Sequence, residues 1–267
     1  MTILLYLLTG AFAGLLGGLL GVGGGLIVVP ALVFSFQAQH FAPEVLTHMA
    51  VGTSLATIIF TSISSVKAHH EHRAVRWELV RLIAPGIVIG TLLGATIAHL
   101  LQGRTLQLVI GSFAILMGLQ MLSGWQPRGK DATPPPLPGN AGLATGGGLI
   151  GMASAIFGIG GGSLTVPWLG LHGVRMQEAV ATSSACGLAI ALSGSIGFVL
   201  TGRHASPLPE HALGYIYLPA FIGISISSVL FARLGAKLAH RLPAATLKKI
   251  FAVLLIIVGS QFVFGMH

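Results

Sequence analysis

The stretches Leu20-Gly-Val-Gly-Gly-Gly-Leu-Ile-Val-Val-Pro30 and Phe157-Gly-Ile-Gly-Gly-Gly-Ser-Leu-Thr-Val-Pro167 place the same glycine-rich break in two very apolar parts of one chain. This repetition divides the protein into two related halves. A helix that is broken at corresponding positions of two hydrophobic halves is typical of a transporter, because backbone amides freed inside a membrane need a protein or ligand partner. The two breaks therefore predict where a substrate is held.

The composition is that of a membrane protein. Of the 267 residues, 54% are hydrophobic and only 7% are charged, whereas about 25% are charged in an ordinary soluble domain. Several apolar runs reach the roughly 20 residues that cross a bilayer. We therefore expect an all-α polytopic membrane protein. Its single cysteine, Cys186, excludes an internal disulfide and a cysteine-based zinc site.

The similarity between the halves continues beyond the glycines. Ala50-Val-Gly-Thr-Ser54 matches Ala179-Val-Ala-Thr-Ser183, and Pro85 matches Pro219. Between the halves lies the run Thr133-Pro-Pro-Pro-Leu-Pro138, which is typical of a stiff extended linker. The predicted division is a first membrane repeat over 1–124, a proline-rich cytoplasmic linker over 125–140 and a second membrane repeat over 141–267.

Each half is expected to contain one long broken segment and three further spans. The broken segments cover 3–34 and 141–171, and the spans cover 49–66, 82–101, 106–123, 179–200, 213–231 and 249–266. If the broken segment crosses the membrane once, the repeats are parallel. If it turns back as a hairpin, either re-entrant or as two short spans, the repeats have inverted topology.

The basic residues distinguish these two topologies, because Lys and Arg in short loops accumulate on the cytoplasmic side. Parallel repeats with a cytoplasmic N-terminus would divide the 14 basic residues equally between the two sides. Hairpins with both termini outside would leave only Arg104 and Arg203 outside. We therefore predict inverted repeats with periplasmic termini. Basic cytoplasmic loops also account for the net charge of +8 without nucleic acid as a partner.

The interior predicted by these spans lacks carboxylates. All the acidic residues fall in or beside predicted loops, namely Glu44, Glu71, Glu78, Asp131, Glu178 and Glu210. A buried cation site or carboxylate proton relay is therefore not expected, and neither is a metal or a cofactor. A hairpin turn of glycines offers the opposite polarity, because free amides and the positive end of the helix dipole favour an anion.

The predicted substrate shell combines the glycine turns with hydroxyls of the next span in each half. Its members are Gly23, Gly24, Gly25, Thr53, Ser54, Gly160, Gly161, Gly162, Thr182 and Ser183. The alternative is that these small residues only permit close helix packing in the membrane. A nucleotide site at the glycines is not supported, because no strand precedes them and no ribose-binding acid follows.

Two further polar positions precede the matched spans. His48 stands before the first of these spans, where the second half has Gln177. A histidine at this depth is a candidate for proton coupling or substrate contact, and the alternative is a polar residue at the membrane interface. The cluster of His69, His70 and His72 lies among basic residues and is interpreted as a solvated loop without metal.

The duplicated run Gly-Val-Gly-Gly-Gly-x-x-x-Val-Pro and the Ala-x-x-Thr-Ser elements resemble the TauE/SafE sulfite exporter family, also called the 4-toluene sulfonate uptake permease family. The resemblance covers nearly the whole chain. It implies a multi-pass permease of the bacterial cell inner membrane for sulfite, organosulfonates or related anions. The second copy departs from the first at Ser163, which replaces Leu26, and at Ala181, which replaces Gly52.

The function predicted from these features is alternating-access transport of a small sulfur-containing anion through the lipid bilayer, either with or without proton coupling. The number of subunits is left open, and no enzymatic activity is expected. One alternative is a passive anion channel. A more distant alternative is a membrane-embedded hydrolase that pairs Ser54 or Ser183 with His48.

Overall fold

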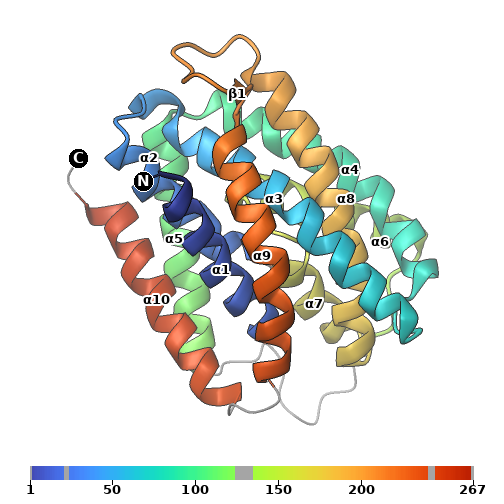
Figure 1. Ribbon diagram of the computed structural model, residues 1–267. Helices are drawn as coiled ribbons and strands as arrows, with labels where there is room; N and C mark the ends of the chain where they lie inside the picture. The colour runs from blue at the N-terminus through green and yellow to red at the C-terminus, as the bar shows by residue number, and fades with distance from the viewer. Residues whose placement is uncertain (1, 21–23, 124–134, 240–243, 266–267) are drawn as a thin grey trace.

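The computed structural model describes residues 2–20, 24–123, 135–239 and 244–265. Within these residues the chain forms ten helices and one short β-hairpin (Figure 1). The elements are α1 Thr2–Leu20, α2 Gly25–Ala38, α3 Pro43–Glu71, α4 Trp77–Leu100, α5 Gly103–Ser123, α6 Asn140–Phe157, α7 Gly162–Leu171, α8 Met176–Gly202, β1 Ala212–Leu213, β2 Ile216–Tyr217, α9 Leu218–Ala239 and α10 Ala244–Phe264.

The outer surface of the helices is apolar, as expected for contact with lipid. Leu4, Leu116, Leu149, Leu230 and Ile257 are each more than half exposed. Among the described residues, the four helices α3, α4, α5 and α8 are long and apolar enough to cross a membrane. The predicted all-α, membrane-embedded class is confirmed at this level.

Both glycine breaks turn the chain back on itself. In the first, the side-chain amide of Gln39 after α2 donates to the hydroxyl of Tyr6 in α1 over 2.7 Å. In the second, a side chain on Gly146 in α6 would meet the ring of Trp168 in α7 2.5 Å away. With 10 residues, α7 spans only about 15 Å, half of a hydrocarbon core of roughly 30 Å. It therefore begins inside the protein.

The two ends of the molecule are defined by its connections. The upper end in Figure 1 carries both termini, the connections 39–42 and 101–102, and the segment 203–217 with the β-hairpin. The lower end carries the connections 72–76 and 172–175. The first hairpin, α1 and α2, starts at the upper end, whereas the second, α6 and α7, starts at the lower end.

The halves are interlocked by helices that run in the same direction. In α1, an added Cβ on Gly10 would lie 2.6 Å from the carbonyl oxygen of Ile224, and one on Gly14 would lie 2.7 Å from the Cα of Ser228. The first helix of the first half thus lies against α9 of the second half. The same arrangement occurs in the other direction: α6, the first helix of the second half, lies against α4 of the first half, with Gly94 beside Met152. Only glycine permits backbones this close.

Corresponding helices of the two halves pack in opposite directions. In α3 and α8, Gly52 lies beside Phe198, and the Ser65 and Ser184 hydroxyls are 2.9 Å apart. In α5 and α10, Gly111 lies beside Phe262, and Gly118 lies beside Ala252. Residue numbers therefore rise along one helix of each pair as they fall along its partner.

Two parts of the predicted layout need comment. The span predicted over 213–231 begins later, at Leu218, because the preceding residues form an antiparallel β-hairpin that pairs Ala212 with Tyr217. Most of the linker predicted over 125–140 lies outside the described residues. Of its described part, residues 135–139 have no regular secondary structure, and Asn140 is the first residue of α6.

Candidate functional site

The two glycine breaks meet inside the protein. A Cβ added to Gly25, the first residue of α2, would lie 2.5 Å from the carbonyl oxygen of Gly158 and 2.9 Å from the Cα of Ile159. Gly158 closes α6 in a left-handed conformation, with φ of 66°, which glycine adopts without strain. The start of one half-helix therefore contacts the turn of the other.

A hydroxyl from the first half holds this contact. Ser54 in α3 is fully buried, and its Oγ donates to the carbonyl oxygen of Gly158 over 2.8 Å. Its own backbone carbonyl accepts a hydrogen bond of 2.7 Å from the hydroxyl of Thr57. The predicted shell members Gly25 and Ser54 are thus brought together at the turn of the second half.

The second break lies equally close to α8. A Cβ on Gly161 would lie 2.7 Å from the carbonyl oxygen of Ser183 and 2.9 Å from the amide nitrogen of Gly187. The Gly161 carbonyl accepts from the amides of Leu164 and Thr165, which begins the helix. The amides of residues 160–162 donate to no acceptor in the described part of the chain. They leave the positive end of α7 facing the interior.

The two threonines of the predicted shell make equivalent hydrogen bonds. Thr53 Oγ1 accepts from the amide of Tyr217, the residue before α9, over 2.9 Å. Thr182 Oγ1 accepts from the amide of Arg76, the residue before α4, over 3.1 Å. Each half therefore ties down the start of a helix in the other half. Each hydroxyl keeps one hydrogen that it can still donate.

The remaining shell members are distributed around this contact. The hydroxyl of Ser183 donates to Val180 in its own helix over 3.0 Å. Gly24 packs against Ala13, and Gly160 faces the side chain of Ile58. Gly162 is the first residue of α7, and Gly23 lies outside the described residues.

Ile58 is a member of the site that the sequence analysis missed. Its side chain lies 3.2 Å from the position of a Cβ on Gly25 and 3.4 Å from that of a Cβ on Gly160, so it touches both breaks. It follows Ser54 by four residues and therefore shares its helix face. This spacing could have identified Ile58 as a candidate site residue from the sequence alone.

His48 is buried near the upper end of α3 and is 3% exposed. Its Nε2 lies 2.9 Å from the carbonyl oxygen of Ala98 and 3.1 Å from that of Leu101, and its Nδ1 lies 3.1 Å from that of Glu44. The ring also stacks on Tyr215 at a centroid distance of 5.0 Å. His48 thus closes the C-terminal end of α4, about 9 Å along the helix from Ser54.

Gln177, at the position that corresponds to His48, has different surroundings. It lies in the first turn of α8 at the lower end and is exposed. The structure therefore places neither residue beside the glycine contact. His48 contacts carbonyl groups and an aromatic ring, and the hydroxyls of Ser54 and Ser183 donate to carbonyls. The described residues therefore contain no serine–histidine pair of the kind a hydrolase would need.

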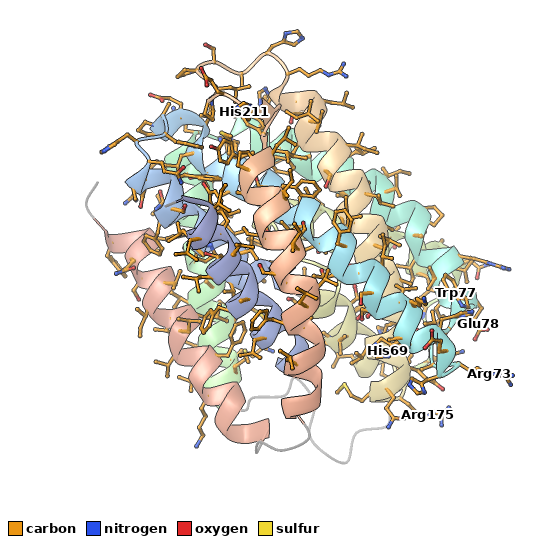
Figure 2. All side chains as sticks on the ribbon, viewed as in Figure 1. His69, Arg73, Trp77, Glu78, Arg175 and His211 are labelled. Atoms are coloured by element: carbon orange, nitrogen blue, oxygen red, sulfur yellow. The ribbon has the colours of Figure 1, made fainter. Side chains whose placement is uncertain are left out.

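The histidine cluster at the end of α3 lies at the lower end, where Figure 2 shows His69, Arg73 and Trp77 near one another. The Trp77 indole donates to Nδ1 of His70 over 3.2 Å. Among the described residues, no group of three or more His, Cys, Asp or Glu side chains is placed to hold a metal ion.

This arrangement of apolar helices around two facing, glycine-broken hairpins defines a helical membrane protein. The profile of the family described as Sulfite exporter TauE/SafE matches residues 6–262. The chain belongs to this family.

Curated relatives agree with this assignment. A "Probable membrane transporter protein" of Haemophilus influenzae is 38% identical over 96% of each chain. "Probable membrane transporter protein YunE" of Bacillus subtilis is 28% identical over 99% of this chain and 98% of its own length. A "Probable membrane transporter protein" of Xylella fastidiosa is 30% identical over 97% and 95%. No solved structure matches the chain. These names indicate a transporter rather than an enzyme.

Proposed function

We propose that this protein carries sulfur-containing anions, such as sulfite or organosulfonates, across the bacterial inner membrane by alternating access. The observation that carries the proposal is the contact between the two glycine breaks at Gly25 and Gly158. The free amides of residues 160–162 lie beside this contact. A helix start with unpaired amides binds an anion without a buried Lys or Arg.

The charges around this contact favour an anion over a cation. Glu44, Glu71, Glu78 and Glu210 are exposed, and Glu178 pairs with Arg175. Asp131 lies outside the described residues. The described interior therefore offers hydroxyls and amides, which donate to an anion, and no carboxylate for a cation.

The two halves act as inverted repeats in this mechanism. The proposal is supported by the antiparallel packing of α3 on α8 and of α5 on α10, and by the hairpins that start from opposite ends. The paired ties of Thr53 and Thr182 also support it, since each fixes the start of a helix in the other half. Rocking of the two halves about the central contact would expose the anion to one side and then to the other.

The proposed orientation places the lower end in the cytoplasm. Basic residues near the lower connections are Lys67, Arg73, Arg76, Arg81 and Arg175, and those near the upper connections are Arg104 and Arg203. This excess follows the positive-inside rule and leaves both termini in the periplasm. The inside-negative potential then favours anion export by about 2.3 kcal/mol per charge per 100 mV.

Sulfite flux into proteoliposomes that contain the purified protein tests the function directly. We expect saturable flux that an organosulfonate competes for and that shows counterflow. Flux without saturation or counterflow would identify an anion channel instead. The absence of flux for sulfite, organosulfonate, sulfate and chloride in folded protein would overturn the proposal.

The same assay under an imposed pH gradient tests proton coupling at His48. If this ring carries the coupled proton, His48→Gln abolishes the response to the gradient and leaves flux driven by the anion gradient. If the ring only closes α4 through the carbonyl groups of Ala98 and Leu101, the substitution lowers stability without changing the pH response.

A further inference from the structure

The two glycine breaks have different walls at one pair of matched positions. The register that aligns Ala50 with Ala179 also aligns Ile58 with Gly187. At the first position, the Ile58 side chain fills the region next to Gly25 and Gly160. At the second, Gly187 has no side chain to place beside Gly161.

Two hydrogen-bond donors face the region in front of Gly187. A Cβ built on Gly187 would lie 3.2 Å from the amide nitrogen of Gly161 and 3.4 Å from the hydroxyl oxygen of Ser62. Gly161 is the N-cap residue of α7, and its amide has no acceptor among the described residues. The dipole of α7 adds positive potential at this point.

Ser62 in α3 is the second of these donors. It is 8% exposed, and its hydroxyl makes no hydrogen bond to any described residue. Some buried serines bond a carbonyl of their own helix, as Ser193 does with Ala189 over 2.7 Å, whereas others, such as Ser154, have no described partner either. What distinguishes Ser62 is its position, 3.4 Å from the place of a Cβ on Gly187. A hydroxyl without a protein partner keeps its hydrogen available for a ligand that can accept it.

We propose that the protein binds a single oxyanion at the second break, with one oxygen accepting from the Gly161 amide and the Ser62 hydroxyl in front of Gly187. This inference rests on the proposed function and assigns its substrate to one half. Among the described residues, the first half supplies Ile58 as an apolar wall and Ser54 as the tie to Gly158, rather than a second anion site. Ser62 and Gly187 thereby become substrate-contacting positions.

The test measures binding separately from transport, with [35S]sulfite in equilibrium dialysis of the purified protein. Gly187→Ala adds only a methyl group, which requires the neighbouring Gly161 amide at 3.2 Å to move by a few tenths of an ångström, and alanine favours the helix. Ser62→Ala removes the hydroxyl alone. The matched controls are Gly170→Ala, where nothing lies within 4 Å of the added Cβ, and Ser193→Ala in the same helix as Gly187. Size-exclusion profiles establish that each variant is folded.

We expect one sulfite per chain in the wild type, at least a tenfold weaker affinity in Gly187→Ala and about a fivefold weaker affinity in Ser62→Ala. Both controls should stay within twofold of the wild type. Proteoliposome flux should fall in the same order. A stoichiometry of two would overturn the single site.

The outcomes separate this inference from the proposed function. If the wild type transports sulfite and both variants bind it normally, the subsite is wrong and the function stands. If the wild type binds chloride or sulfate but not sulfite, and Gly187→Ala abolishes that binding, the subsite stands and the substrate class is wrong. If folded wild type binds none of these anions, both proposals fail.

Discussion

The upper and lower ends of the protein each contain a hydrogen bond from a backbone amide to a threonine hydroxyl, but very different side chains pack around the two bonds. At the upper end, the segment that Thr53 ties down inserts Tyr217 among Tyr6, Phe36 and Phe41, at ring-centroid distances of 5.1 to 6.2 Å. We call these four residues the upper cluster. Aromatic contacts of this kind bury large areas in fixed geometries.

At the lower end, the segment that Thr182 ties down precedes α4 and contributes Val75. It packs with Val80, Ala181 and Ala185 in a small group separate from the main core, which we call the lower cluster. The backbone ties match, but far less apolar surface is buried at the lower end. In the proposed alternating-access mechanism, the lower end is therefore expected to open at a smaller free-energy cost.

One pair of residues at matched positions of the two halves reflects this difference in packing between the ends. In the upper half of α3, a Cβ on Gly52 would lie 2.7 Å from the carbonyl oxygen of Tyr215 and 3.1 Å from Phe198. The corresponding position in α8 is Ala181, whose methyl group is part of the lower cluster. The replacement of Gly52 by Ala181 in the second copy thus follows from the different packing at the two ends.

The largest effect is expected from truncation within the upper cluster. Tyr217→Ala removes the contacts with three aromatic rings and should lower the free energy of unfolding by about 3 kcal/mol. Val75→Ala in the lower cluster should cost only about 1 kcal/mol. Thermal unfolding of the purified variants measures both effects, and equal losses would contradict the comparison.

The next effect concerns the exchanged pair at Gly52 and Ala181. Gly52→Ala should destabilise the protein by about 2 kcal/mol, because the added methyl meets the backbone of Tyr215 and cannot be accommodated by a side-chain movement. Ala181→Gly should cost about 1 kcal/mol through helix propensity and lost contacts. If Gly52→Ala unfolds at the wild-type temperature, the upper end is looser than described.

The hydrogen bonds accepted by Thr53 and Thr182 should differ by a smaller amount in their contribution to the free energy of unfolding. Thr53→Val and Thr182→Val each leave one backbone amide without its acceptor, at about 1–2 kcal/mol. Thr53→Val should be the more costly change, because the amide of Tyr217 lies among aromatic side chains and that of Arg76 lies at the basic end. Hydrogen exchange of these two amides in the variants distinguishes the ties. An equal increase in exchange rate at both amides would show that the two hydrogen bonds contribute equally to stability.

The smallest effect is expected at Gln177. Because this side chain is exposed, Gln177→Ala should change stability by less than about 0.5 kcal/mol. His48→Ala at the matched position should cost clearly more, since it removes the ring that contacts two carbonyl groups at the end of α4 and one in the first turn of α3. Thermal unfolding of the two variants measures this difference. A larger loss of stability in Gln177→Ala than in His48→Ala would contradict it.

The sequence predicted the main features of the fold because they follow from local properties. Glycine triplets in apolar surroundings predicted where the chain breaks, and the distribution of Arg and Lys favoured hairpins over single crossings. The start of α9 was predicted too early, because Ile216 and Tyr217 are apolar enough to continue the helix and pair instead with β1. Apolarity alone does not distinguish these two states.

The candidate site was less accessible to prediction, because its geometry depends on contacts between distant segments. The Thr53 hydroxyl and the Tyr217 amide are 164 residues apart in sequence, and nothing near Thr53 indicates this partner. The exchange of Ile58 for Gly187 was visible in the repeat alignment. Its structural role depends on the packing of α7 against α8, which brings Gly161 next to Gly187.

The parallel packing of α1 on α9 has a consequence for the biogenesis of the protein. Gly10 and Gly14 in α1 face Ile224 and Ser228, which are synthesised about 200 residues later, roughly 10 to 40 s at ordinary translation rates. During this time, the glycine face of the first hairpin has no native neighbour in the membrane. Insertion therefore precedes assembly by a long interval, and a chain truncated before α9 is an expected substrate for membrane quality control.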